Sequence, residues 1–179
     1  MSRSQKEHKM PEQERVRERE RPPLQDNPYE RTLVYRREQA ERNKNGPIVI
    51  KKKDRQVFMA RQGRIRFFLD PGYYKDVPLL QWRVFTHEVR TKSGRHRHQG
   101  GLVIYVIEGK GYSIVEGKRM DWEKGDLVLL PLNPDEVEHQ HFNRDPEKPA
   151  LWAAFIHIPI QEHLASDLQQ TENSPEFKE

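Results

Sequence analysis

Two stretches of sequence decide the fold: GRHRHQGGLVIYVIEGKG at residues 94–111 and GDLVLLPLNPDEVEHQHFN at residues 125–143. Each combines a histidine pair with a short apolar run of strand length, bounded by glycine or proline. Side chains two positions apart leave the same face of a strand. The HRH and HQH pairs therefore predict histidines on the inward faces of two strands, where they can meet one metal ion.

Further short runs of apolar and β-branched residues lie on both sides of these stretches. Turn sequences such as Asp70-Pro71-Gly72 separate them about every eight to twelve residues, which is typical of an antiparallel sandwich or barrel. We therefore expect an all-β fold. The expected strands cover residues 48–50, 65–69, 79–90, 102–107, 112–115, 119–122, 127–130, 136–142 and 151–158.

The N-terminal part of the chain has a different composition. Residues 1–55 hold more Lys and Arg than Asp and Glu, and few apolar side chains, so we expect a charged arm. Within the arm, residues 1–28 are expected to be disordered and residues 29–44 to form a helix that stops at Asn45-Gly46.

The remaining sequence predicts one barrel and a short C-terminal segment. The barrel is expected over residues 56–160, and residues 161–179 are expected to form a short helix and a tail. The chain has no run of about 18 apolar residues, so no membrane helix is expected. Residues 1–21 lack the apolar stretch of a secretory signal, and the expected location is the cytoplasm.

Charge and cysteine content exclude further classes of protein. The net charge is +4, but glutamates interrupt the basic arm and no nucleic-acid-binding motif is found, so nucleic acid is not an expected partner. The chain has no cysteine, which excludes disulfides, iron–sulfur clusters and thiolate ligands. A metal site must therefore use histidine, carboxylate or carbonyl groups, and histidine binds iron, manganese, nickel and zinc alike.

The two stretches quoted above resemble the two sequence motifs of the cupin family. The first has an HxH pair, an apolar strand and a glycine turn at Gly109. The second has Gly125, Pro131, His139 and Asn143, with a longer gap between the proline and the histidine than the family pattern has. The resemblance implies a jelly-roll barrel, also called a double-stranded β-helix.

Within the cupins, the chain resembles one cupin unit of gentisate and salicylate 1,2-dioxygenases. The glutamate that most cupins carry after the HxH pair is absent here, as in those enzymes. The resemblance implies a three-histidine site of His96, His98 and His139 that holds iron(II), with manganese, nickel or zinc as alternatives. It also implies that His141 faces substrate or oxygen as a catalytic group.

Other positions depart from that enzyme family. Ile104 stands where the family carries an arginine for the substrate carboxylate, and Ala154 and His157 stand where it carries aspartates. Those enzymes also contain two cupin units, whereas this chain has one. The resemblance therefore supports the metal site more strongly than the substrate.

The strand before the HxH pair offers substrate-binding candidates. Gln81, Arg83 and His87 alternate onto one face, and Arg83 can bind a carboxylate with two parallel hydrogen bonds. The alternative is that this face lies in solvent. Tyr105 and Trp152 are candidates to line the cavity, although large apolar residues are commonly plain core.

The expected function is oxidative C–C cleavage of a small aromatic or enol substrate by an iron(II)-dependent dioxygenase. One alternative is a metal-dependent isomerase, lyase or decarboxylase that does not use O₂. Another is a non-catalytic cupin that binds a small molecule. The expected partners are a small-molecule substrate, O₂ and a second copy of the chain in a homodimer.

Overall fold

The computed structural model describes residues 27–178. The chain divides into two compact units, residues 1–45 and residues 46–179. Apart from residues 27 and 28, the stretch expected to be disordered lies outside the described residues.

In the first unit the described part is one helix, α2 (Pro28–Asn45), close to the expected range. The Oδ1 atom of Asn27 accepts hydrogen bonds from the backbone N–H groups of Tyr29 and Glu30. Asn27 therefore caps the helix by satisfying two backbone donors that have no partner inside it.

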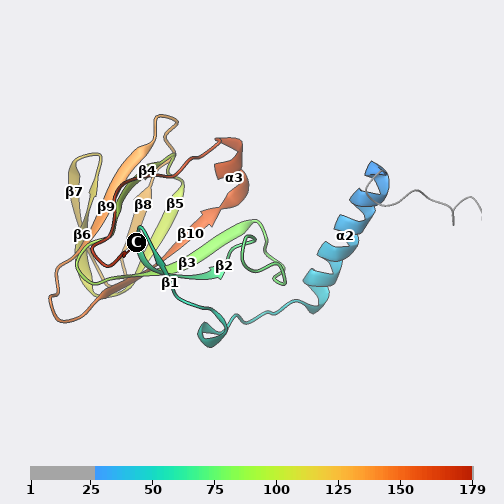
Figure 1. Ribbon diagram of the computed structural model, residues 1–179, viewed down its shortest axis with the longest axis horizontal. Coiled ribbons are helices and arrows are strands. Elements are labelled where there is room, and N and C mark those ends of the chain that lie inside the picture. Colours follow the sequence, from blue (N-terminus) through green and yellow to red (C-terminus); the bar gives the residue numbers. More distant parts are fainter. Residues whose placement is uncertain (1–26, 179) are drawn as a thin grey trace, which may run out of the picture. The chain divides into compact units, whose positions relative to one another are not determined.

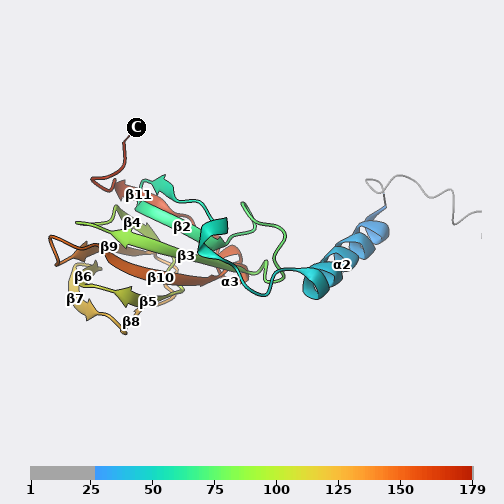
Figure 2. The same ribbon diagram turned by 90° about the horizontal axis from the view of Figure 1, so that it is seen from below.

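The second unit is a barrel of two antiparallel sheets (Figures 1 and 2). One sheet has the strand order β1-β2-β3-β10-β5-β8, and the other has the order β11-β4-β9-β6-β7. The strands are β1 (Phe58–Ala60), β2 (Gly63–Leu69), β3 (Trp82–Val89), β4 (Arg95–His98), β5 (Leu102–Glu108), β6 (Lys110–Val115), β7 (Lys118–Glu123), β8 (Leu127–Leu130), β9 (Val137–Asn143), β10 (Ala150–His157) and β11 (Gln169–Glu172). The expected all-β jelly-roll architecture is thus confirmed.

The core lies between the two sheets. Leu102, Ile104 and Val106 alternate along β5 and are buried, and they belong to one apolar cluster with Trp122 of β7 and Trp152 of β10. This cluster occupies one part of the barrel interior. The histidine-bearing strands β4 and β9 pair with each other in the opposite sheet.

One strand expected near the start of the barrel is not formed. Residues 48–50 form no strand, because they have no partner to pair with, and Ile48 and Val49 are exposed. The compact unit also begins at Gly46 rather than at residue 56. Arg55 belongs to this unit: it is buried, and its Nε–H donates to the carbonyl of Phe68.

The C-terminal segment is also more ordered than expected. The short helix α3 (Ile158–His163) starts earlier than predicted. The strand β11 lies within the segment predicted as helix and tail, and it pairs antiparallel with β4. The last strand therefore covers the edge of the strand that carries His96 and His98. Within the described residues, no helix has both the length and the apolar content needed to cross a membrane.

Candidate metal centre

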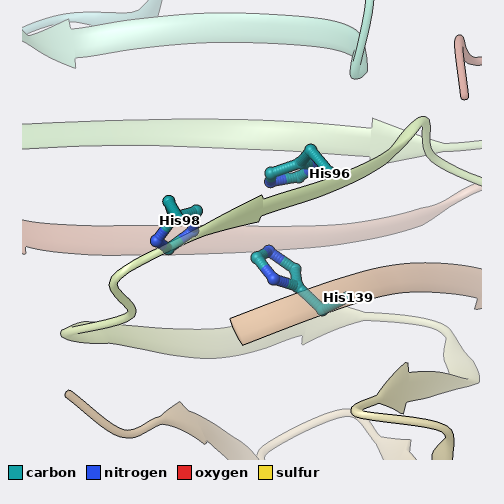
Figure 3. Close-up of side chains that lie close together, drawn as sticks. All are labelled: His96, His98 and His139. Atoms are coloured by element: carbon teal, nitrogen blue, oxygen red, sulfur yellow. The ribbon is translucent and has the colours of Figure 1, made fainter. Parts of the chain in front are cut away.

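Strand pairing brings the three predicted ligands together. His96 and His98 are buried on β4, whose alternate residues Arg95 and Arg97 are exposed. His139 lies on β9, directly opposite His96 in the register of the two strands. Their three imidazoles converge from these two neighbouring strands inside the barrel, as Figure 3 shows.

The three rings are close enough to share one ion. The ring centroids of His96 and His139 are 4.2 Å apart, and those of His98 and His139 are 4.9 Å apart. One ligand nitrogen from each residue lies within 4.8 Å of the other two. Metal–nitrogen bonds of about 2.1 Å require nitrogens about 3 to 3.5 Å apart, so small side-chain rotations close the site.

The donor set fits a divalent transition metal. Among the residues that the structure describes, the cluster contains three imidazoles and no carboxylate. Imidazole nitrogen is a suitable ligand for iron, nickel, copper and zinc, whereas calcium and magnesium require oxygen ligands. The site is therefore suited to a transition metal held by three neutral ligands.

Hydrogen bonds decide which ring nitrogen is free on two of the ligands. The carbonyl oxygen of Gly94 lies 3.3 Å from His96 Nδ1, and that of Val137 lies 3.1 Å from His139 Nδ1. A carbonyl can only accept, so each Nδ1 carries the proton. The Nε2 lone pairs of His96 and His139 are then free to bind a metal.

His98 is held in the opposite way. The Gly100 N–H donates to His98 Nδ1 at 2.9 Å, so the neutral ring carries its proton on Nε2. Coordination through Nε2 therefore requires the proton to move to Nδ1 and the Gly100 amide to release it. Gly100 and Gly101 have φ values of 73° and 76°, which only glycine adopts at little cost. The loop after His98 is thus the part that must adjust when a metal binds.

Burial keeps the imidazoles of the site neutral. Desolvation lowers the pKa of His96 to about 4, and desolvation together with the charge of His96 lowers the pKa of His98 to about 4. Desolvation, and then the neighbouring histidines, hold the pKa of His139 and His141 well below the usual value. At pH 7 no proton has to be removed from these rings before they bind a cation.

The histidines face a cavity of about 780 Å³ inside the barrel. His141 also lines this cavity and is only 2% exposed. Its ring centroid lies 5.4 Å from that of His139 and 5.0 Å from that of Trp152. His141 therefore lies beside the cluster of His96, His98 and His139.

Three of the five predicted substrate-binding residues line the cavity, namely Arg83, His87 and Trp152. Tyr105 does not, because strand alternation turns it away from the interior that Ile104 faces, and it is 43% exposed. Gln81 does not either, because it precedes the start of β3 and is exposed. Neither residue therefore lines this cavity.

Asp70 is a cavity residue that the sequence did not indicate. The sequence predicts Asp70 only as part of a turn, and its Oδ1 does accept the Gly72 N–H. Its Oδ2 accepts a hydrogen bond of 2.6 Å from Arg83 Nε, and the carboxylate is buried. The pairing fixes the Arg83 guanidinium at the cavity wall. Its terminal nitrogens make no hydrogen bond within the described residues.

Aromatic side chains line the cavity between the surface and the histidines. Tyr73 is exposed, and its ring stacks on Phe67 with a centroid distance of 5.3 Å. Phe67 contacts Phe85 at 5.5 Å, and Phe85 contacts Trp152 at 6.1 Å. These rings come from the strands β2, β3 and β10 and from the loop after β2, so no single stretch of sequence signals them.

Two buried polar atoms of the cavity wall have no hydrogen-bond partner within the described residues. They are His87 Nε2 and Trp152 Nε1, and their two rings meet edge to face at 4.7 Å. Burial lowers the pKa of His87 to about 3, so its ring is neutral. The wall therefore offers one unsatisfied donor, the indole N–H of Trp152, whereas the ring of His87 also interacts with the backbone of Gln62.

Comparisons with known proteins agree with this fold. Residues 83–158 match the family model of the cupin domain. A gentisate 1,2-dioxygenase from Ralstonia is 32% identical over 66 residues, which cover 36% of this chain and 18% of that enzyme. A gentisate 1,2-dioxygenase from Streptomyces is 30% identical over 95 residues, which cover 52% of this chain and 25% of that enzyme. The chain thus matches a quarter or less of the length of these relatives.

Solved structures share the fold at lower identity. A salicylate 1,2-dioxygenase variant from Pseudoaminobacter salicylatoxidans, in complex with gentisate, superposes with a TM-score of 0.50 at 19% identity, covering 78% of this chain and 36% of that one. A variant of Streptomyces PAC13, solved with uridine, gives 0.51 at 12% identity, covering 73% of this chain and 95% of that one. This chain therefore contains a cupin domain that resembles a cupin unit of the gentisate and salicylate 1,2-dioxygenases.

Proposed function

We propose that the chain is a non-haem iron(II)-dependent dioxygenase that cleaves a carbon–carbon bond of a small aromatic or enol substrate. The observation that carries the proposal is the cluster of His96, His98 and His139, three buried neutral imidazoles that face a cavity of about 780 Å³. The sequence likeness to two gentisate 1,2-dioxygenases supports the same class of reaction for the part of the chain that matches.

The charge of the site favours an anionic chelating substrate. Three neutral ligands leave the +2 charge of iron(II) uncompensated, unlike a site that includes a carboxylate. A catecholate, a hydroxy acid or an enolised diketone restores the balance through two oxygens. When bound, iron(II) supplies open coordination positions for substrate and O₂ and the route for electrons between them. Manganese, nickel or zinc are the alternative metals for the same ligands.

The aromatic wall suits a flat substrate. Phe67, Phe85 and Trp152 present ring faces and edges along the cavity, which favour offset or edge-to-face contact with another ring. Ile104 and Ile156 add apolar lining. A small aromatic ring can therefore be held by these side chains between the cavity mouth and the histidines.

Polar groups at the wall set the position of the substrate. The Arg83 guanidinium, held through Nε by Asp70, is proposed to bind a carboxylate with its terminal nitrogens. His87 Nε2 and Trp152 Nε1 are proposed to pair with polar substituents, because a hydroxyl group can both donate and accept. His141 is proposed to be the catalytic group beside the metal that contacts substrate or oxygen.

We further propose that the barrel forms a homodimer through the outer face of β5, β8 and β10. Exposed apolar side chains lie next to one another there: Val103 opposite Leu129 and Phe155, and Tyr105 opposite Leu127. None of them is charged, so the patch can pack against a copy of itself around a two-fold axis without like-charge repulsion.

Oxygen consumption tests the proposed reaction. Iron(II)-loaded protein is screened in an oxygen electrode against catechols, hydroxybenzoates and β-diketones, beside His139→Ala and the control His163→Ala, which removes an exposed histidine. We expect at least one compound to drive oxygen uptake that His163→Ala retains and His139→Ala loses. Uptake that His139→Ala retains would contradict the proposal. Metal-dependent conversion of a compound without uptake would instead support a Lewis-acid enzyme.

A further inference from the structure

His141 lies at the end of a chain of buried hydrogen bonds. The indole Nε1–H of Trp122 donates to Ser113 Oγ at 2.9 Å, and Ser113 Oγ lies 2.7 Å from His141 Nδ1. The exposed fractions are 5% for Trp122, 0% for Ser113 and 2% for His141. Their strands β7, β6 and β9 are neighbours in one sheet, and Ser113 lies directly opposite His141 in the register.

The chemistry of the three groups sets the direction of these bonds. An indole nitrogen only donates, so the Ser113 hydroxyl cannot donate to Trp122. Within the described residues, the one other group bonded to Ser113 Oγ is His141 Nδ1. If Nδ1 carried a proton, the oxygen would meet two donors and the hydroxyl proton would be buried without an acceptor, which is costly. Ser113 therefore donates to Nδ1, and the His141 proton is on Nε2.

The backbone of His141 is fixed as well. Its N–H donates to Ser93 Oγ at 2.9 Å, and its carbonyl accepts the Ser93 N–H at 2.8 Å. The ring packs edge to face on Trp152. Rotation of the ring would break the bond to Ser113, so Nε2 is the nitrogen that His141 has available for the cavity that it lines.

We propose that Trp122 and Ser113 are positioning residues that hold His141 as an Nε2–H donor, so that it binds an anionic oxygen of the ligand. A phenolate, enolate or carboxylate oxygen accepts such a bond, whereas a group that must lose its proton to His141 finds no lone pair there. His141 then stabilises negative charge on oxygen and does not act as a general base. The role in substrate binding rests on the proposed function, but the tautomer does not.

Nitrogen NMR tests the tautomer without any activity assay. Protein labelled with ¹⁵N-histidine is loaded with zinc(II), which is diamagnetic, and two-bond ¹H–¹⁵N correlations assign the protonated nitrogen of each ring. The signals of His141 are identified by their loss in His141→Gln. We expect parent His141 to show a protonated Nε2 and an unprotonated, hydrogen-bonded Nδ1. A protonated Nδ1 in the parent protein would overturn the inference.

Variants of the chain test the positioning role. Ser113→Ala removes the donor to Nδ1, and we expect His141 to show a mixture of tautomers or a protonated Nδ1. Ser113→Thr keeps the hydroxyl and should retain the parental pattern. Trp122→Phe keeps an aromatic ring but removes the indole donor to Ser113, and we expect it to give a pattern between those of the parent and Ser113→Ala. It replaces Ser113→Ala as the test if that variant does not fold. An unchanged Nε2–H pattern in folded Ser113→Ala would refute the role of Ser113.

The outcome is separable from that of the proposed reaction. If the parent shows the Nε2–H tautomer but no compound drives oxygen uptake, the inference on positioning stands and the dioxygenase proposal fails. If oxygen uptake is found but His141 carries its proton on Nδ1, the dioxygenase proposal stands and the positioning role of Ser113 and Trp122 is rejected.

Discussion

His87 is a buried histidine that stays neutral in the folded protein, which makes the stability of the fold depend on pH. His87 is 2% exposed, and its pKa falls from 6.5 to about 3 because burial disfavours the charged ring. The unfolded chain therefore binds a proton below pH 6.5 that the folded chain does not. The contribution of neutral His87 to the free energy of unfolding is complete above pH 6.5. It is lost progressively as the pH falls from there toward about 3.

We predict that replacing His87 flattens this pH dependence in metal-free protein. When the pH falls from 7 to 5, proton linkage to one such histidine lowers the free energy of unfolding by about 2 kcal/mol. Urea unfolding of His87→Phe across that range should therefore show a loss smaller by about that amount. His163→Phe, which replaces an exposed ring, should keep the parental slope. Equal slopes in the parent and His87→Phe would contradict the burial of a neutral His87.

Arg83 gives a second prediction at the residue scale. We expect Arg83→Gln to raise the KM for carboxylate-bearing substrates at least tenfold, since a hydrogen bond between charged groups is worth about 1.5–3 kcal/mol. The kcat should change less. The matched control is Arg119→Gln, which also removes an arginine paired with a carboxylate, Asp121, but on the exposed surface of β7. A KM that is unchanged in Arg83→Gln would place the substrate carboxylate elsewhere.

At the scale of elements, the loop between β4 and β5 contacts His98, one of the three proposed metal ligands. Gly100 has a φ of 73°, its amide contacts His98, and an added Cβ would lie 1.9 Å from the carbonyl oxygen of Pro131. Gly117 has nearly the same φ, 74°, but an added Cβ there would meet nothing within 4 Å. An alanine at either position has the same backbone strain, but only at Gly100 does it also meet a steric contact. Comparing the two substitutions therefore separates the two effects.

We predict that Gly117→Ala costs about 1–2 kcal/mol of unfolding free energy, the price of a left-handed alanine, and leaves metal content unchanged. Gly100→Ala should cost more and should lower metal content, because the backbone must move away from Pro131 and would carry His98, two residues earlier, away from the other two ligands. Urea unfolding and elemental analysis of both variants check this. Full metal content in Gly100→Ala would show that the loop does not position His98.

The sequence predicted the elements where the signal was local and missed them where it was not. The HxH pairs could be placed on inward strand faces because the side-chain period of a strand is two. The strand β11 is polar, QQTE, and forms because it pairs with β4, so its own residues did not signal it. Asp70 and Ser113 were missed for the same reason: their partners, Arg83 and His141, are brought to them by folding.

At the scale of the whole molecule, the outer face of β5, β8 and β10 carries a group of exposed apolar side chains. Leu127 and Leu129 are 61% and 62% exposed on β8, next to Val103 and Tyr105 of β5. Large contiguous apolar patches on protein surfaces mark interaction sites. The proposed homodimer would cover it.

We predict that Leu129→Glu converts a dimer to a monomer, because two buried glutamates would face each other across the two-fold axis. The control is Met120→Glu, which changes a 42%-exposed apolar residue on β7, in the other sheet. Light scattering coupled to size exclusion measures the mass of each protein. A parent that is already monomeric, or a dimeric Leu129→Glu, would reject this face as the interface.

We propose that His96, His98 and His139 hold the metal, and the iron content of the purified protein tests this. Protein is loaded with iron(II) without oxygen, freed of excess metal and analysed for iron, beside variants with each histidine changed to alanine and beside His163→Ala. We expect one iron per chain in the parent and in His163→Ala. We also expect a fall in iron affinity of more than about 100-fold in each of the three variants, exceeding the effect of losing an outer-shell partner. Equal iron in the parent and the three variants would contradict the proposal.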